Sequence, residues 1–323
     1  MINKSSIPST IGGQAVLDGV MMKSDTNYTV AIRAADHTIK VLSYPFLSYC
    51  KKFPILNVPI IRGAVNFFQM LKLGNTVLQI SANETLGEDT TPSPLERWLS
   101  KIFGGSISSI ITFISLILGL TLSVVLFMFF PIALTSLFEN SLSVDLGVWR
   151  NLLEGLFRIA ILLAYLWTIS RMKDMKVLFS YHGAEHKAIA CYESGEELTP
   201  HNAQTYTRFH PRCGTSFIFV IIMIGILFYS LPIFRWNGII SRVLMKLLLF
   251  PIVAGIGYEF IRFAGKHMNT GWVRFLSSPG LWLQHITTRE PSIEQLEVAI
   301  SAINALENRS NTTQISINQS EGA

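Results

Sequence analysis

The chain has 323 residues, of which 50% are hydrophobic and 15% are charged, and its formal net charge is +5. Soluble proteins carry about 25% charged residues, so this composition excludes an ordinary water-soluble globular protein and predicts a membrane protein. The apolar content also excludes a chain that is disordered over most of its length. Three cysteines are too few for a disulfide scaffold, and the odd number indicates a reducing compartment or a metal-binding role.

The first 50 residues predict a small sheet. Residues 11–50 contain short alternating or apolar pieces, AVLDGVMM, YTVAIRA and TIKVLSY, separated by the turn residues SDTN and ADH. This pattern is typical of an antiparallel sheet, and we expect three strands.

Residues 51–101 predict a helix followed by a linker. The helix, residues 59–81, is long enough to cross a bilayer, but its glycines and side-chain amides favour a position in the membrane interface. The polar stretch GEDTTPSP, residues 87–94, predicts the linker.

Four apolar segments predict a transmembrane domain over residues 102–263. A crossing helix needs about 20 predominantly apolar residues, and each segment approaches or exceeds that length. Pro131 is expected to kink or end the first helix. The segments are Gly104 to Phe138, Leu152 to Ile169, Phe217 to Phe234 and Val243 to Phe263.

The distribution of basic residues predicts the orientation. Ten Lys and Arg residues precede residue 102, six lie between residues 171 and 212, and five follow from residue 262, which is 21 of the 26. Because cytosolic loops of membrane proteins are enriched in Lys and Arg, we expect both termini and the loop 171–216 to be cytosolic. The start of the chain has no pattern of a cleavable signal peptide. No basic stripe with interleaved aromatic residues indicates nucleic-acid binding.

The cytosolic C-terminal segment, residues 264–307, is predicted to contain an amphipathic helix. After Pro291, apolar residues recur with helical spacing over residues 292–307. Residues 308–323 are polar, which predicts a disordered tail.

The strongest chemical signal is the pentapeptide HGAEH. On a helix, His182 and His186 lie one turn apart on the same face, which lets two imidazoles bind one metal ion. Glu185 lies between them in sequence, as in the H-x-x-E-H pattern of inverse zincins, where the carboxylate acts as a general base. Glu185 is therefore the candidate catalytic residue.

A second pair in the same loop extends this site. His210 and Cys213, in HPRCG, would complete a set of three imidazoles and one thiolate, which suits Zn²⁺. Four protein ligands would make a closed structural site, whereas catalysis needs three ligands and an open position. The sequence leaves both alternatives open.

Two charged pairs lie near the ends of the predicted spans. Glu154 and Arg158 are four residues apart and are expected to pair on one helix face. Glu259 and Arg262 are expected either to pair with each other or to reach the metal site and orient its ligands.

Several blocks together resemble the YqhQ-like family of bacterial membrane proteins. They are GGQAVLDGVMM, PIIRGAVNFF, YHGAEHKAIACYE, RFHPRCGTSFIFV, PIVAGIGYEFIRFAGK and LQHITTREP. The resemblance implies a family of unknown function that carries the label of a metal-dependent enzyme. It also makes Arg289 and Glu290, in LQHITTREP, further candidates near the metal site.

These observations predict a mainly α-helical membrane protein with a small cytosolic antiparallel sheet and a cytosolic helical loop that holds zinc. The expected location is the bacterial inner membrane. One hypothesis is a metal-dependent hydrolase that acts on membrane-near substrates. The alternative is a non-enzymatic scaffold or regulator with a structural zinc site, which binds a protein partner through the sheet or the C-terminal helix or forms a homo-oligomer.

Overall fold

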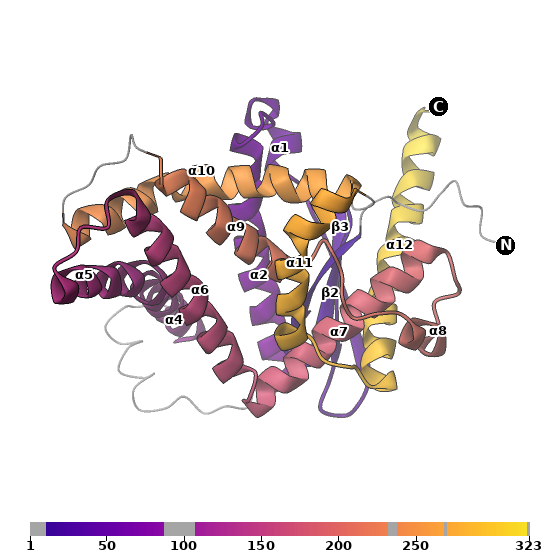
Figure 1. Ribbon diagram of the computed structural model, residues 1–323. Helices are drawn as coiled ribbons and strands as arrows, with labels where there is room; N and C mark the ends of the chain where they lie inside the picture. Colours follow the sequence, from indigo (N-terminus) through magenta and orange to yellow (C-terminus); the bar gives the residue numbers. More distant parts are fainter. Residues whose placement is uncertain (1–10, 87–106, 232–237, 268–269, 322–323) are drawn as a thin grey trace. The chain divides into compact units, whose positions relative to one another are not determined.

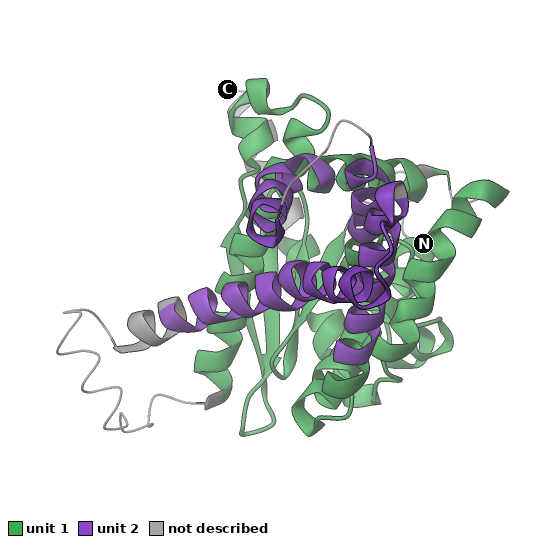
Figure 2. Cartoon of the chain, turned by 60° about the vertical axis from the view of Figure 1, so that its left-hand side comes forward, with its two compact units in different colours: residues 1–85, 166–220, 254–323 green, residues 86–165, 221–253 purple. Residues whose placement is uncertain are grey.

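The computed structural model describes residues 11–86, 107–231, 238–267 and 270–321 (Figure 1). The predicted linker at residues 87–94 lies outside these residues. The chain forms two compact units, shown in Figure 2. Unit 1 comprises residues 1–85, 166–220 and 254–323, and unit 2 comprises residues 86–165 and 221–253. The two units are described separately below.

Unit 1 contains the predicted antiparallel sheet, with four strands where the sequence suggested three. Its strands follow chain order as a meander. The additional strand arises because AVLDGVMM turns back on itself at Leu17 and Asp18, and Asp18 has a positive φ of 48°. Asp is among the residues that tolerate this left-handed conformation in a tight turn. The strands are β1 (Gly12–Val16), β2 (Gly19–Lys23), β3 (Asn27–Arg33) and β4 (Ile39–Pro45).

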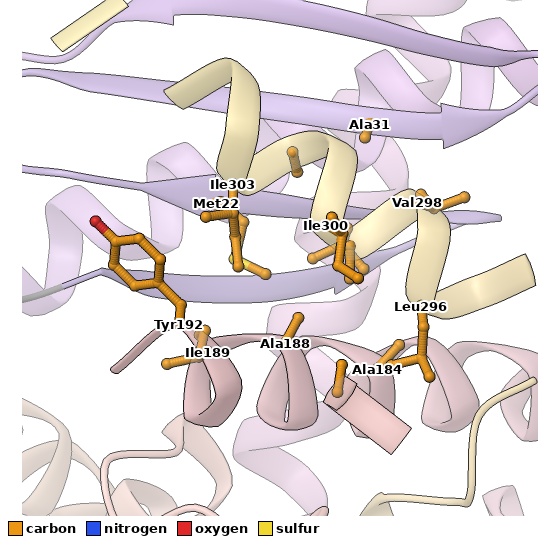
Figure 3. Packing of buried hydrophobic residues seen from close by; sticks show 14 of the residues in the cluster. Met22, Ala31, Ala184, Ala188, Ile189, Tyr192, Leu296, Val298, Ile300 and Ile303 are labelled. Atoms are coloured by element: carbon orange, nitrogen blue, oxygen red, sulfur yellow. The ribbon is translucent and has the colours of Figure 1, made fainter. Parts of the chain in front are cut away.

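Both faces of the sheet are covered by helices. Alternate residues of a strand point to opposite faces, so Val20 and Met22 join one core while Met21 joins the other. The first core contains side chains of α7 (Lys173–Ser194) and α12 (Ile293–Glu321), as Figure 3 shows. The second core contains side chains of α2 (Ile61–Leu86).

Helix α12 confirms the predicted amphipathic helix. Leu296, Ile303 and Leu306 lie in the core between the sheet and α7, and the Thr29 hydroxyl of β3 donates to the Ala302 carbonyl at 2.7 Å. The helix continues to Glu321, beyond residue 308, where the sequence predicts a disordered tail. The polar composition of residues 308–323 shows only that this segment cannot form a core of its own. Adding residues to the end of an existing helix costs little free energy, because the unfavourable nucleation step is already complete.

Helix α2 corresponds to the helix predicted at residues 59–81. Its inner face packs Leu73 and Val77 against the sheet. The short helices α1 (Tyr49–Lys52) and η1 (Pro54–Leu56) precede it. Within the described residues, α2 is not among the helices that are apolar enough to cross a membrane.

Helix α2 also contacts α10 (Ile239–Lys266) through small and charged residues. A Cβ added to Gly63 would lie 2.7 Å from the Gly255 carbonyl oxygen, so glycine permits the close approach. Arg62 donates to both carboxylate oxygens of Glu259, at 2.6 and 2.5 Å. The carboxylate of Glu259 is thus bound by Arg62. The sequence pattern suggested Arg262, three residues away, because it could compare only neighbours on the same helix.

Unit 2 contains a continuous helical run with a π-helical turn. The run consists of α4 (Ile107–Val124), η2 (Val125–Phe129) and α5 (Phe130–Leu142). Pro131 has no N–H group and therefore cannot bond the carbonyl of Phe127 four residues earlier. Arg158 Nε donates to that carbonyl at 2.7 Å. Pro131 thus lies just after the π-helical turn η2, and the helix continues beyond it to Leu142.

Among the described residues of unit 2, three cations lie within ion-pairing distance of Glu154. This residue lies in α6 (Arg150–Ile169), which follows the short helix η3 (Gly147–Trp149). Its buried carboxylate accepts from Arg242 at 3.1 Å and from Lys246, both in α10. The predicted pairing of Glu154 with Arg158 is therefore wrong in detail, because Glu154 has closer cations on another helix while Arg158 bonds a freed carbonyl.

Three helical stretches among the described residues are long and apolar enough to cross a membrane, namely Ile114–Leu142, Arg150–Ile169 and Ile239–Gly265. The remaining predicted span corresponds to α9 (Gly214–Tyr229), which has 16 residues. A helix of this length is about 24 Å long, less than the roughly 30 Å of a bilayer core. The predicted end of this span, Phe234, lies outside the described residues.

Candidate metal centre

Helix α7 places the two histidines of HGAEH side by side. His182 and His186 are one turn apart, and their ring centroids lie 4.4 Å from each other. Between them, Gly183 faces the chain that follows α11 (Gly271–Thr287). A Cβ at Gly183 would lie only 2.0 Å from the Arg289 carbonyl oxygen. Glycine at this position therefore allows a second segment to reach the histidines.

Cys213 completes a group of three. It ends the loop after α8 (Pro200–Thr205) and directly precedes α9. His182 Nε2 lies 3.1 Å from Cys213 Sγ. One ligand atom from each of His182, His186 and Cys213 lies within 4.8 Å of the other two. This arrangement could hold a metal ion.

Backbone carbonyls fix the orientation of both imidazoles. His182 Nδ1 donates to the Thr287 carbonyl at 2.8 Å, and His186 Nδ1 donates to the Arg208 carbonyl at 2.5 Å. A carbonyl oxygen can only accept, so Nδ1 carries the proton and the Nε2 lone pair remains free. Metal-binding histidines commonly show this arrangement. Burial also lowers the pKa of His186, which favours the neutral, metal-binding form.

His210 lies beside this group without belonging to it. Its ring centroid is 5.5 Å from that of His186, but its Nε2 is 3.9 Å from a Glu193 carboxylate oxygen. Burial raises the pKa of Glu193, but the contacts with His210 and Arg212 outweigh this effect and leave the pKa below its usual value. The structure therefore brings together three of the four predicted ligands and gives His210 an anionic partner.

Gln284 holds the loop that carries His210 and Cys213. Its side chain is fully buried. It accepts from the His210 backbone N–H at 2.8 Å and donates to the His210 carbonyl at 2.8 Å and to the Ser216 hydroxyl at 3.0 Å. The sequence interpretation missed this residue. The only signal was its position in the block LQHITTREP, five residues before Arg289, the nearer of the two candidates in that block.

Glu185 occupies an enclosed position against the sheet. Its side chain is 5% exposed and touches Gly13 of β1. Burial raises its pKa to about 7, although the nearby His182 opposes the shift. Glu185 does not belong to the three-residue ligand group. It is a carboxyl group next to that group, with a proton affinity suited to proton transfer near neutral pH.

The further candidates near the site have different surroundings. Glu259 is bound by Arg62, as described above, and Arg262 is exposed. The Arg289 backbone N–H donates to the Phe179 carbonyl at 2.8 Å, and Glu290 pairs with Lys187 at 2.8 Å. Both of these contacts attach the segment after α11 to α7. Arg289 and Glu290 therefore support the segment that supplies the Thr287 carbonyl to His182.

The donor set fits a borderline or soft transition metal. Two imidazole nitrogens and one thiolate suit Zn²⁺, whereas Mg²⁺ and Ca²⁺ prefer oxygen ligands. His186 and Cys213 are 2% and 6% exposed, so an ion held here would be largely screened from solvent.

Comparisons with known proteins identify the family. A family described as "Protein of unknown function (DUF1385)" matches residues 58–309, which include all three grouped ligands. The chain is 33% identical over 305 residues to the "Uncharacterized protein YqhQ" of Bacillus subtilis (strain 168), and the match covers 94% of each chain. No solved structure matches the chain significantly. The protein therefore belongs to the DUF1385 family, which confirms the YqhQ-like resemblance of its sequence motifs.

Proposed function

We propose that the protein is a multi-pass protein of the bacterial cytoplasmic membrane that binds Zn²⁺ at its cytosolic face through His182, His186 and Cys213. One observation carries this proposal. Both imidazoles donate Nδ1–H to backbone carbonyls and direct their other edge toward one thiol. Such an arrangement leaves two nitrogen lone pairs and a sulfur directed at one point, which a metal ion would satisfy.

The proposed orientation rests on the apolar helices and the basic residues. With α9 as a fourth crossing, both termini and the loop 171–216 lie on the same side of the membrane. That side carries 21 of the 26 Lys and Arg residues, which makes it the cytosolic side. Cysteine-accessibility labelling from either side of sealed vesicles tests this topology, and labelling of the two termini from opposite sides would contradict it.

The proposed activity is hydrolysis of a membrane-near substrate. Three protein ligands leave one coordination position for water or substrate, as in catalytic zinc sites. Zinc held there supplies Lewis acidity to a carbonyl or phosphoryl oxygen. Glu185 would accept and return a proton, because its raised pKa of about 7 allows both directions near neutral pH. Gly13 would confine the Glu185 carboxylate by close contact.

Metal content tests the ligand set. In the full-length protein in detergent, mass spectrometry of bound metals is expected to find about one zinc per chain. His182→Ala, His186→Ala and Cys213→Ser should each lose it, whereas His210→Ala should retain it. Replacement with Co²⁺ should add a sulfur-to-cobalt charge-transfer band that Cys213→Ser abolishes. Retention of zinc in all three ligand variants would overturn the site.

A structural zinc site remains the second candidate, and two observations favour it. The ligands His186 and Cys213 are almost completely buried, and the ring of His210 is near enough to His186 to turn toward the ion. In this case the sheet or α12 would serve a protein partner. Glu185→Gln separates the two candidates when assayed against ester, peptide and phosphoester substrates. Zinc retained with turnover lost supports the hydrolase, whereas wild-type protein with no turnover supports the structural site.

A further inference from the structure

A cavity in unit 1 lies next to the metal centre. Its volume is about 690 Å³, and it is lined by residues at the end of α6, on α7, in the loop before α9 and after α11. Arg208 and Thr288 connect the two sites. The Arg208 carbonyl accepts from His186, and Thr288 directly follows Thr287, whose carbonyl accepts from His182. The cavity itself contains none of the three ligand side chains.

The lining is strongly positive. Its charged residues are the four cations Arg171, Lys176, Arg208 and Arg289 and one anion, Glu290. Glu290 is already paired with Lys187, at 2.8 Å, and with Arg208, at 3.4 Å. In the described part of the chain, the other three cations have no carboxylate within ion-pairing distance. Their charges are therefore available to an anion.

Arg289 provides a second observation. One terminal nitrogen donates to the Ser170 carbonyl at 3.0 Å, which fixes the guanidinium at the cavity wall. Its Nε is buried and has no hydrogen-bond partner among the described residues. A buried donor without an acceptor costs free energy, and an acceptor from a ligand would remove that cost.

The cavity lies at the end of a membrane-spanning helix. Trp167 and Arg171 lie at and just after the end of α6, and the Arg171 guanidinium stacks over the Trp167 ring at 4.6 Å. Tryptophan and basic residues mark the level of lipid headgroups at the ends of such helices. On α11, Trp272, Phe275 and Trp282 are exposed, which places further aromatic side chains on the same unit. The cavity is thus positioned where phosphate groups of lipids lie.

We propose that this cavity binds a phosphate group, with Arg171, Lys176 and Arg289 as the charged contacts. Guanidinium groups match phosphate oxygens in geometry and charge. The phosphate can be part of a lipid headgroup or be free in the cytosol. This inference does not depend on the zinc site, since none of its residues is a metal ligand.

Calorimetric titration of the full-length protein in phosphate-free detergent tests the proposal. The probes are inorganic phosphate and the short-chain lipid dioctanoyl phosphatidic acid. Saturable binding of both with similar affinity identifies phosphate itself as the ligand, whereas much tighter binding of the lipid identifies the headgroup source. Absence of saturable binding by both probes overturns the proposal.

A matched pair of double variants locates the binding. Arg171→Gln with Lys176→Gln removes two cations from the cavity and should weaken binding about tenfold or more. Lys173→Gln with Arg274→Gln removes two exposed cations that do not line the cavity and should change affinity less than about twofold. Equal weakening in both pairs would show general charge attraction and overturn the cavity. If melting shows that the first pair is destabilised, Lys176→Gln alone gives the same comparison against Lys173→Gln.

Discussion

Gly13 of β1 lies directly against the side chain of Glu185 on α7. A Cβ built on Gly13 would be 2.6 Å from Glu185 Cγ and 2.6 Å from its Oε1. The GGQAV strand therefore forms one wall around this carboxylate. A glycine near the N-terminus and a glutamate in the middle of the chain thus depend on each other across 172 residues of sequence.

The first prediction concerns this contact. Gly13→Ala should destabilise the protein by about 1–3 kcal/mol, because the added methyl group overlaps Glu185 in a packed interior. The adjacent Gly12→Ala is the control, since nothing lies within 4 Å of its Cβ position. Thermal unfolding in detergent measures both. Adding Glu185→Ala to Gly13→Ala should recover part of the loss, and strict additivity of the two changes would contradict the contact.

The second prediction concerns Gln284, which holds the loop of Cys213. Gln284→Leu removes its three hydrogen bonds to His210 and Ser216 and replaces the amide with an apolar side chain of similar size. If the zinc site is present, zinc affinity should fall about 10–100-fold, as for other residues that orient ligands indirectly. Competition with a chromophoric chelator measures the affinity. Gln79→Leu, at an exposed position of α2, should leave it unchanged, and equal affinities in the two variants would exclude the supporting role.

The third prediction concerns the ion pair between α2 and α10. Arg62→Met should lower the free energy of unfolding by about 1–2 kcal/mol, because it removes two short hydrogen bonds to the half-buried Glu259. Lys51→Met breaks the exposed pair with Asp25 and should cost less than about 0.5 kcal/mol. Denaturation of the two variants side by side gives the comparison. A larger effect at Lys51 would show that the Arg62 pair contributes little.

Local patterns in the sequence were sufficient for several elements. Alternation over residues 11–50 predicted an antiparallel sheet, and the count of three strands was wrong because only two residues separate β1 from β2. Helical spacing placed His182 beside His186, which the ring distance confirms. The spacing of residues along one strand or helix determines which of its side chains share a face. These predictions therefore did not require knowledge of the tertiary fold.

Contacts between distant segments could not be predicted in the same way. The direction of His210 depends on Glu193 and on Gln284, which follows it by 74 residues. The partner of Glu259 is Arg62, 197 residues earlier in the chain. Residue types alone made His210 an equally good ligand. In the fold, Glu193 of α7 lies beside its ring and Gln284 of α11 holds its backbone.

The Thr287 carbonyl that orients His182 follows it by 105 residues. During synthesis, both histidines and Cys213 leave the ribosome well before this carbonyl, and α12 follows later still. A nascent chain that ends before residue 287 therefore contains every grouped ligand but lacks the contact that selects the His182 tautomer. The order of translation therefore separates the appearance of the proposed ligands from the completion of the geometry that orients them.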